Sequence, residues 1–187
     1  MPCYRPALVI LVMLAIIWPT ESQAQASTKP RAFGVKVQAY PAGLIVAVQG
    51  SFAVGHKDAV RAFAAYNATD RRDFGEHDNE EGGGPGFGLA WRHYLAAGHQ
   101  GIHFGARTDL WFLEIDWEDD AGPRAGTTDI TVLQSAAQMG YTWTAAQDRL
   151  VLEGTVALGA EINVRTQGEP VGEGAILLVG FGVTYRL

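Results

Sequence analysis

Apolar and polar residues alternate along most of the chain after residue 30, and the last stretch shows the pattern most clearly. Its odd-numbered positions are all apolar: Ala175, Leu177, Val179, Phe181, Val183, Tyr185 and Leu187. Its even-numbered positions begin with the apolar Ile176 and Leu178 and then hold the glycines and the polar residues: Gly180, Gly182, Thr184 and Arg186. A period of two is that of a β-strand whose two faces meet different surroundings. We therefore predict a strand here with one face turned to an apolar phase.

The same period predicts eight strands and almost no helix. We place them at 33–40, 43–53, 58–68, 86–96, 101–113, 128–144, 148–163 and 175–187. Strands of this length with one wholly apolar face fit a membrane barrel better than a soluble sandwich, whose strands are typically about 5–6 residues long. The expected fold class is all-β: a closed, eight-stranded, antiparallel, up-and-down transmembrane β-barrel.

The connections between these strands differ in length from one end of the expected barrel to the other. Short turns are predicted at 54–57, 97–100 and 145–148, and longer polar loops at 69–85, 114–127 and 165–174. The first hairpin, at residues 41–43, is tight and breaks this rule. Outer-membrane barrels have short periplasmic turns and longer external loops. Aromatic residues predict two belts at headgroup depth. One belt comprises Phe33, Phe52, Phe104, Tyr141, Trp143 and Tyr185, and the other comprises Tyr66, Phe87, Trp111 and Phe112.

The N-terminus carries an export signal. Arg5 precedes an unbroken apolar run from Ala7 to Trp18, and Ala24 and Ala26 form the small-x-small pattern that a signal peptidase reads. This run is too short to span a bilayer core of about 30 Å. We predict a signal peptide at 1–26, with cleavage near Ala26, and a barrel domain at 27–187. The single cysteine, Cys3, lies inside the signal, so the mature chain is expected to have no disulfide.

The net charge and the mean hydropathy bear on the partners and on the class of protein. A net charge of −6 and a pI near 5.3 argue against nucleic acid as a partner. The mean hydropathy of +0.02 is that of a soluble protein. It is equally compatible with a barrel, because lipid-facing and lumen-facing residues cancel in the average.

In its architecture the chain resembles the small eight-stranded outer-membrane barrels of the OmpA transmembrane-domain and OmpX kind. The resemblance covers the mature chain and rests on the strand count, the loop asymmetry and the final strand, Ile176 to Leu187. In that family the final strand is read by the barrel-insertion machinery and usually closes with an aromatic residue. Here Leu187 takes that position, and Tyr185 lies two residues before it on the same face. The resemblance implies the outer membrane of a Gram-negative bacterium as location. It also implies lipid, lipopolysaccharide and the insertion machinery as partners.

The face that we assign to the lumen carries nine ionisable residues: Lys36, Arg61, Arg92, His103, Arg107, Asp109, Glu153, Glu161 and Arg186. Six of these are potential cations and three are carboxylates. An eight-stranded barrel is just wide enough for its side chains to fill it. We interpret these residues as a packed ionic network that plugs the lumen. The alternative is a narrow, anion-preferring pore, which the excess of cations favours.

Catalysis is not expected. It requires a nucleophile and a base within hydrogen-bonding reach, and the mature chain beyond residue 27 has only Ser51 and Ser135 as serines. His56 lies close to Ser51 in sequence but in a predicted turn, and Ser135 lies on the lipid-facing side of its strand. No catalytic residue and no cofactor are predicted.

The segment from Thr69 to Pro85 is the most unusual one. Its carboxylates Glu76, Asp78, Glu80 and Glu81 are a weak candidate site for a divalent cation. Their spacing does not match the calcium-binding loop pattern, and Arg71 and Arg72 offer internal neutralisation. We interpret the segment as a solvated surface loop.

Three functions follow from these patterns. The first is a non-enzymatic barrel with a structural or interaction role through its external loops. The second is a porin-like channel for small solutes. The third is a soluble, periplasmic, lipocalin-like binding protein, which would put apolar residues inside the barrel and polar residues outside.

Overall fold

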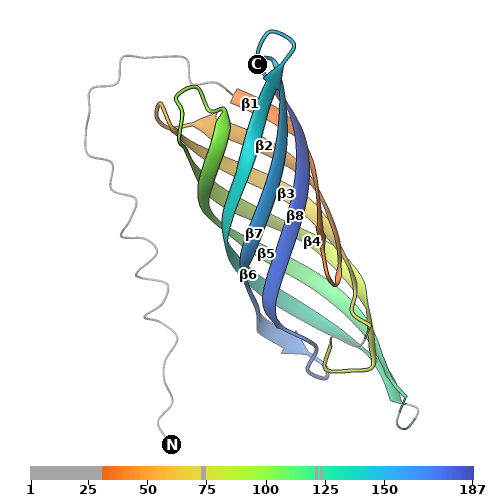
Figure 1. Ribbon diagram of the computed structural model, residues 1–187. Coiled ribbons are helices and arrows are strands. Elements are labelled where there is room, and N and C mark those ends of the chain that lie inside the picture. The colour runs from red at the N-terminus through yellow and green to blue at the C-terminus, as the bar shows by residue number, and fades with distance from the viewer. Residues whose placement is uncertain (1–30, 73–74, 121, 123) are drawn as a thin grey trace, which may run out of the picture.

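The computed structural model describes residues 31–72, 75–120, 122 and 124–187, and they form one closed barrel of eight antiparallel strands (Figure 1). The predicted fold class is confirmed. Each strand pairs with the next, and β1 pairs with β8 to close the barrel. The predicted signal peptide lies outside the described residues. Within the described part of the chain, no helix is long and apolar enough to cross a bilayer.

The strands differ more than twofold in length. They are β1 (Arg31–Tyr40), β2 (Gly43–Ala53), β3 (Asp58–Asp70), β4 (Asn79–Tyr94), β5 (Gly101–Asp119), β6 (Arg124–Ala145), β7 (Leu150–Gln167) and β8 (Gly174–Arg186). We call the end where β1 begins and β8 finishes the turn end, because the connections there, at 54–57, 95–100 and 146–149, are short. The opposite end is the loop end, with connections at 41–42, 71–78, 120–123 and 168–173.

Two of the three long loops predicted at the loop end are shorter than expected, because most of 114–127 and about half of 69–85 are strand, whereas most of 165–174 is the connection 168–173. The largest difference is in 114–127, where only 120–123 connects β5 to β6. The hairpin of β5 and β6 is the tip that protrudes at the lower right of Figure 1. Inward and outward side chains continue to alternate along β5 there, but the outward ones are polar. Glu114 and Asp116 are exposed, and Ile115 between them is buried. The outward polar residues of this segment led to the prediction of a loop. They belong instead to the part of the strand that extends beyond the apolar outer surface.

The outer surface of the barrel is apolar and the alternation predicted for β7 and β8 is confirmed. Leu158 and Val179 are 64% and 54% exposed, whereas Leu178 is fully buried. Nine of the ten predicted belt aromatics have exposed rings on the outside. Trp111 is the exception, at 0% exposure. It was assigned wrongly because Leu110, Trp111 and Phe112 are all apolar, so this part of β5 does not reveal which face is inside.

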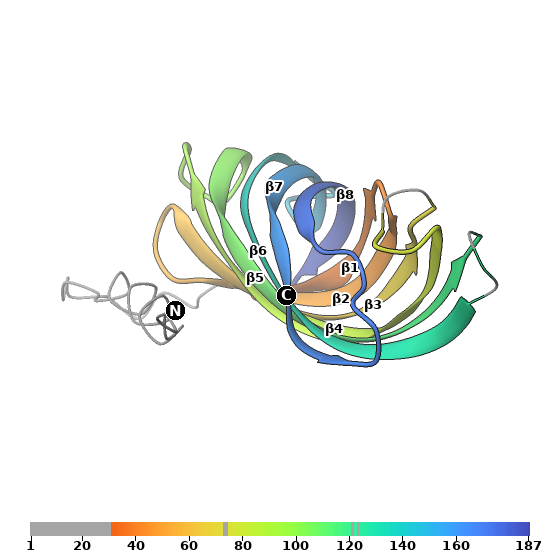
Figure 2. The same ribbon diagram turned by 90° about the horizontal axis from the view of Figure 1, so that it is seen from below.

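The interior has two unlike halves. The half toward the loop end contains an apolar cluster. Its largest members are Tyr40, Ile45, Trp111, Leu113, Ile115, Trp117, Ile130, Ile176 and Leu178. Glycine makes room for the indole rings, because a Cβ at Gly86 would overlap Trp111 and one at Gly126 would lie 2.6 Å from Trp117. The half toward the turn end is polar and charged. Figure 2, seen from below, shows the strands curving around the interior.

Candidate functional site

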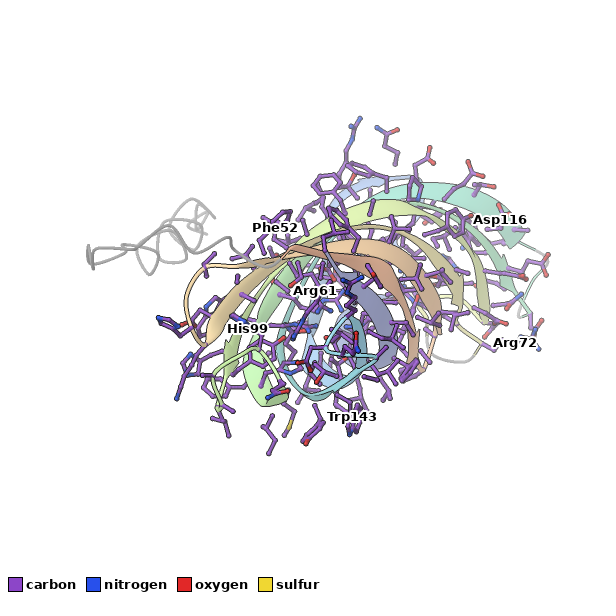
Figure 3. The ribbon with its side chains drawn as sticks, turned by 90° about the horizontal axis from the view of Figure 1, so that it is seen from above. Phe52, Arg61, Arg72, His99, Asp116 and Trp143 are labelled. Carbon is purple, nitrogen blue, oxygen red and sulfur yellow. The ribbon has the colours of Figure 1, made fainter. Side chains whose placement is uncertain are left out.

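The candidate site is the polar half of the lumen, to which five strands contribute charged side chains. Lys36 of β1, Arg61 of β3, Arg92 of β4, Arg107 of β5 and Glu153 of β7 all point inward and are at most 6% exposed. Each occupies the inward position of its strand, next to outward apolar neighbours. Figure 3 shows Arg61 inside the ring of strands, whereas Phe52 and Trp143 point away from it.

Glu153 is the centre of this half. Its carboxylate accepts hydrogen bonds from Arg92 through both Nη atoms, the one from Nη2 at 2.8 Å. Nη1 of Arg61 lies 2.9–3.0 Å from its two oxygens, and Nζ of Lys36 lies 3.7 Å from Oε1. Strands β3 and β4 are not neighbours of β7 in the sheet, so these bonds cross the lumen. The pairs therefore fill the barrel from wall to wall.

A second ion pair lies next to this one. Arg107 donates to Asp109 from Nε (3.2 Å) and from Nη2, and both side chains are almost fully buried. Arg107 also donates from Nη1 to Oε1 of Gln38 at 2.7 Å, and its guanidinium lies 5.1 Å from the ring centre of Phe63. Gly88 makes this arrangement possible, because a Cβ there would overlap Asp109 and Phe63. This pair is neutral as a unit.

Three of the predicted lumen residues lie apart from Glu153. The buried His103 packs against Tyr94, with ring centres 5.0 Å apart, and its Nδ1 lies 3.4 Å from Oγ1 of Thr142. Arg186 lies at the turn end, where it donates to the carbonyls of Gly98 and His99 at 3.3 and 3.1 Å. Glu161 lies toward the loop end, where Nη2 of Arg71 approaches its Oε1 to 2.6 Å.

At the loop end, a seal of polar contacts closes the mouth of the barrel. Arg71 bridges Glu161 at 2.6 Å and Glu80 at 3.5 Å and also donates to the carbonyl of Gly172. Glu80 is fully buried and accepts from the backbone N–H groups of Glu76 (2.8 Å) and Gly172 (3.1 Å). These bonds join the 71–78 and 168–173 connections across the mouth. Sequence reasoning did not find this seal, because it depends on contacts between connections about 90 residues apart.

His77 forms a second link between connections at the loop end. Its ring is stacked on Trp117 with centres 4.1 Å apart and planes at 14°. Nδ1 lies 2.8 Å from Oδ1 of Asp119, and Nε2 lies 3.0 Å from the carbonyl oxygen of Pro170. One imidazole therefore contacts the β5–β6 hairpin and the β7–β8 connection at once.

The four carboxylates of the weak cation candidate have separate roles in the structure. Glu80 belongs to the buried seal, and Asp78 accepts from the backbone N–H of Asp120 at 2.7 Å. Glu76 and Glu81 are both exposed. Among the residues that the structure describes, no three potential ligands are close enough together to hold a metal ion. Arg71, expected to neutralise this segment, does so from inside the seal.

The serines are not arranged for nucleophilic catalysis. Oγ of Ser135 lies 3.2 Å from Oγ1 of Thr108 on the outer side of the barrel. His93 faces Asp58, with Nδ1 3.0 Å from Oδ1. Within residues 31–72, 75–120, 122 and 124–187, no hydrogen bond joins a serine to a histidine.

Comparison with known proteins shows that the chain is similar in fold to solved outer-membrane proteins. No protein-family model matches the chain, and no curated protein sequence is similar to it. A major outer membrane protein from Thermus thermophilus superimposes with a TM-score of 0.54 at 16% identity, over 86% of this chain and 100% of that one. The Neisserial surface protein A (NspA) does so with a TM-score of 0.50 at 10% identity, over 88% and 100%. The N-terminal barrel domain of Pseudomonas aeruginosa OprF superimposes with a TM-score of 0.47 at 10% identity, over 83% of this chain and 97% of that one.

The outward apolar band, the inward charges and the closed eight-stranded topology agree with this likeness. The chain thus has the fold of the small eight-stranded outer-membrane β-barrels, as its sequence had suggested.

Proposed function

We propose that the protein is an integral outer-membrane barrel of a Gram-negative bacterium, inserted after export and cleavage near Ala26. In this proposal it is neither an enzyme nor an open channel, and its loop end is an interaction surface outside the cell. One observation carries the proposal: large apolar side chains are exposed all around the barrel while charged side chains are buried inside it. Such a distribution is stable only where lipid surrounds the outer surface.

The loop end supports the proposed orientation. Strands β4 to β7 continue there past the last apolar ring, Phe112, and carry exposed carboxylates such as Glu114 and Asp116 on their outer face (Figure 3). The seal around Glu80 and the contacts of His77 link described residues of the 71–78 and 168–173 connections to each other. The longer loops of outer-membrane barrels are extracellular. Lipopolysaccharide and an external ligand are the proposed partners, and the insertion machinery is the proposed partner during assembly.

The interior argues against a channel. The ion pairs of Glu153 and Arg107 cross the polar half, and the apolar cluster and the seal fill the other half. Solute passage would require breaking buried ion pairs, each loss of a partner costing about 3–5 kcal/mol. A lipocalin-like soluble protein is also disfavoured, because its outer surface would be polar.

Two measurements test the proposal. The first is site-directed labelling in intact cells. The only cysteine of the sequence, Cys3, lies in the predicted signal peptide, so the mature chain offers no competing thiol. Arg72→Cys at the loop end should react with a membrane-impermeant maleimide, and His56→Cys at the turn end should react only after lysis. The reverse pattern would overturn the orientation, and reaction of both would overturn membrane insertion.

The second measurement combines fractionation with conductance. The protein should appear in outer-membrane fractions and migrate faster on gels before boiling than after it. Purified protein in planar bilayers should give no steady current. A stable anion-selective current would contradict the proposal of a closed barrel and support the alternative, a small-solute channel.

A further inference from the structure

A small cavity lies at the centre of the polar half of the lumen. Its volume is about 10 Å³, and its polar lining consists of Lys36, Gln38, Arg61, Arg92, Arg107 and Gln138. The rest of the wall is apolar. A space of this size accommodates about one water-sized particle. Four of the six polar side chains around it are cationic, and none is a carboxylate.

The ion pairs around the cavity do not balance. Glu153 is shared by Lys36, Arg61 and Arg92, so the two arginines alone carry one positive charge more than this carboxylate, and Lys36 adds a second when it is protonated. The neighbouring pair of Arg107 and Asp109 is neutral and cannot supply the missing charge. The polar half therefore holds an excess of positive charge in a place that water reaches poorly.

Two of the arginines that line the cavity also have unused donors. Nε of Arg61 and Nε of Arg92 are buried and have no hydrogen-bond partner among the described residues. Nζ of Lys36 has only the 3.7 Å contact with Glu153, which is longer than a hydrogen bond. Buried donors are normally satisfied, and buried charges are normally paired. An arginine cannot relieve the imbalance by losing its proton.

From this geometry we infer that the lumen binds one small monovalent inorganic anion, of the chloride class, in the cavity between Lys36 and the three arginines. An anion there would balance part of the excess charge and accept bonds from cationic donors, which are stronger than bonds between neutral groups. The cavity is too small for an organic anion. This inference concerns the ion content of the barrel and is independent of what the loop end binds.

The test is refolding of the full mature protein in detergent at equal ionic strength with sodium chloride, sodium bromide or sodium gluconate. Because the lumen is closed, the anion must be present during refolding. Ligands that bind only the folded state stabilise it by mass action. We expect the midpoint of thermal unfolding to rise with the logarithm of the chloride or bromide concentration and to stay lower in gluconate. Equal midpoints in all three salts would mean that water occupies the cavity, and would overturn the inference.

A variant that supplies the missing charge separates lumen binding from surface effects. Gln38→Glu places a carboxylate at the cavity wall, where the side chain already accepts from Arg107 at 2.7 Å. This variant should be more stable than the parent in gluconate and should lose most of its dependence on halide. Gln100→Glu, exposed in a turn-end connection, is the matched control and should keep the full dependence. If both variants keep it, the halide acts on the surface and the inference fails.

Crystals grown in bromide provide the direct readout. We expect an anomalous peak within hydrogen-bonding distance of Lys36 or of one of the arginines, and none in crystals of Gln38→Glu. Bromide peaks confined to the outer surface would contradict a lumen site. Lys36→Met, which removes one cation from the cavity wall, should weaken the halide dependence, whereas Lys57→Met in an exposed turn should not change it.

Discussion

Arg92 of β4 and Glu153 of β7 form a two-pronged ion pair across the lumen, between strands that do not touch in the sheet. Both side chains are 1% exposed. The same carboxylate also holds Arg61 and Lys36, so one residue organises cations from three strands.

Replacing the central carboxylate should weaken the barrel strongly. Glu153→Gln keeps the shape of the side chain but leaves three buried cations without their shared counter-charge. We expect a loss of about 3–5 kcal/mol in the free energy of unfolding, measured by urea denaturation in lipid vesicles. Glu118→Gln, at an exposed position on the outer face of β5, should change it by less than about 0.5 kcal/mol. Equal effects of the two changes would show that the network is not stabilising.

A cation introduced on the outer surface should impair insertion where the surface meets lipid. Val179 is 54% exposed in the middle of β8, and Val179→Arg should cost about 2–4 kcal/mol if it lies near the bilayer centre. Asp116→Arg lies on the same outer face but near the tip of the β5–β6 hairpin (Figure 3) and opposite Glu81, so it should be tolerated. The measurement is the heat-modifiable fraction after refolding into vesicles. Similar folded fractions for the two variants would place both positions outside the apolar band.

A methyl group at the inward glycines should disturb the apolar half. A Cβ at Gly86 would overlap the buried ring of Trp111 and lie 2.7 Å from the carbonyl oxygen of Leu110. Gly86→Ala should therefore destabilise the barrel by about 1–3 kcal/mol through overpacking. At Gly154 the nearest atom to a Cβ is 3.7 Å away, in the ring of Trp143, so Gly154→Ala should be nearly neutral. The thermal midpoint and the near-ultraviolet circular dichroism of the tryptophans report the difference.

Removing the His77 ring should loosen the loop end without unfolding the barrel. His77→Ala loses the stacking on Trp117 and the bonds to Asp119 and Pro170 together. We expect faster proteolytic cleavage in the 71–78 and 168–173 connections, with an unchanged heat-modifiable gel shift. His56→Ala, in an exposed turn-end connection, should leave the cleavage rate as it is in the parent. Unchanged cleavage of the His77 variant would show that the seal around Glu80 suffices on its own.

The fold could be predicted from the sequence because the strands alternate cleanly where lipid meets a polar interior. Leu177, Val179 and Phe181 are exposed, as alternation predicted, and the intervening Leu178 is buried. The parity of a strand is harder to assign where both faces are apolar. Trp111 could have been placed inside by counting in steps of two from Arg107 and Asp109, which are charged and inward.

The loop end was harder to predict for a different physical reason. Beyond the lipid, water replaces the apolar phase outside, so exposed Glu114 and Asp116 alternate with buried Ile115. The reversed polarity was the available signal for a longer strand. The burial of Glu80 had no comparable signal, because its partners Arg71 and Gly172 come together only in the closed barrel.

The ladder between β1 and β8 has a consequence for how the molecule assembles. Every other ladder joins consecutive strands, whereas this one pairs Lys36 with Gly182 and closes nearly the whole described chain into a ring. Bringing ends about 150 residues apart together costs about 4 kcal/mol in chain entropy, by the usual logarithmic dependence on loop length. Glu153 gains the contact with Lys36 of β1 only when the ring closes. Charge pairing inside the lumen thus stabilises the closed ring relative to open sheets that lack the β1–β8 ladder.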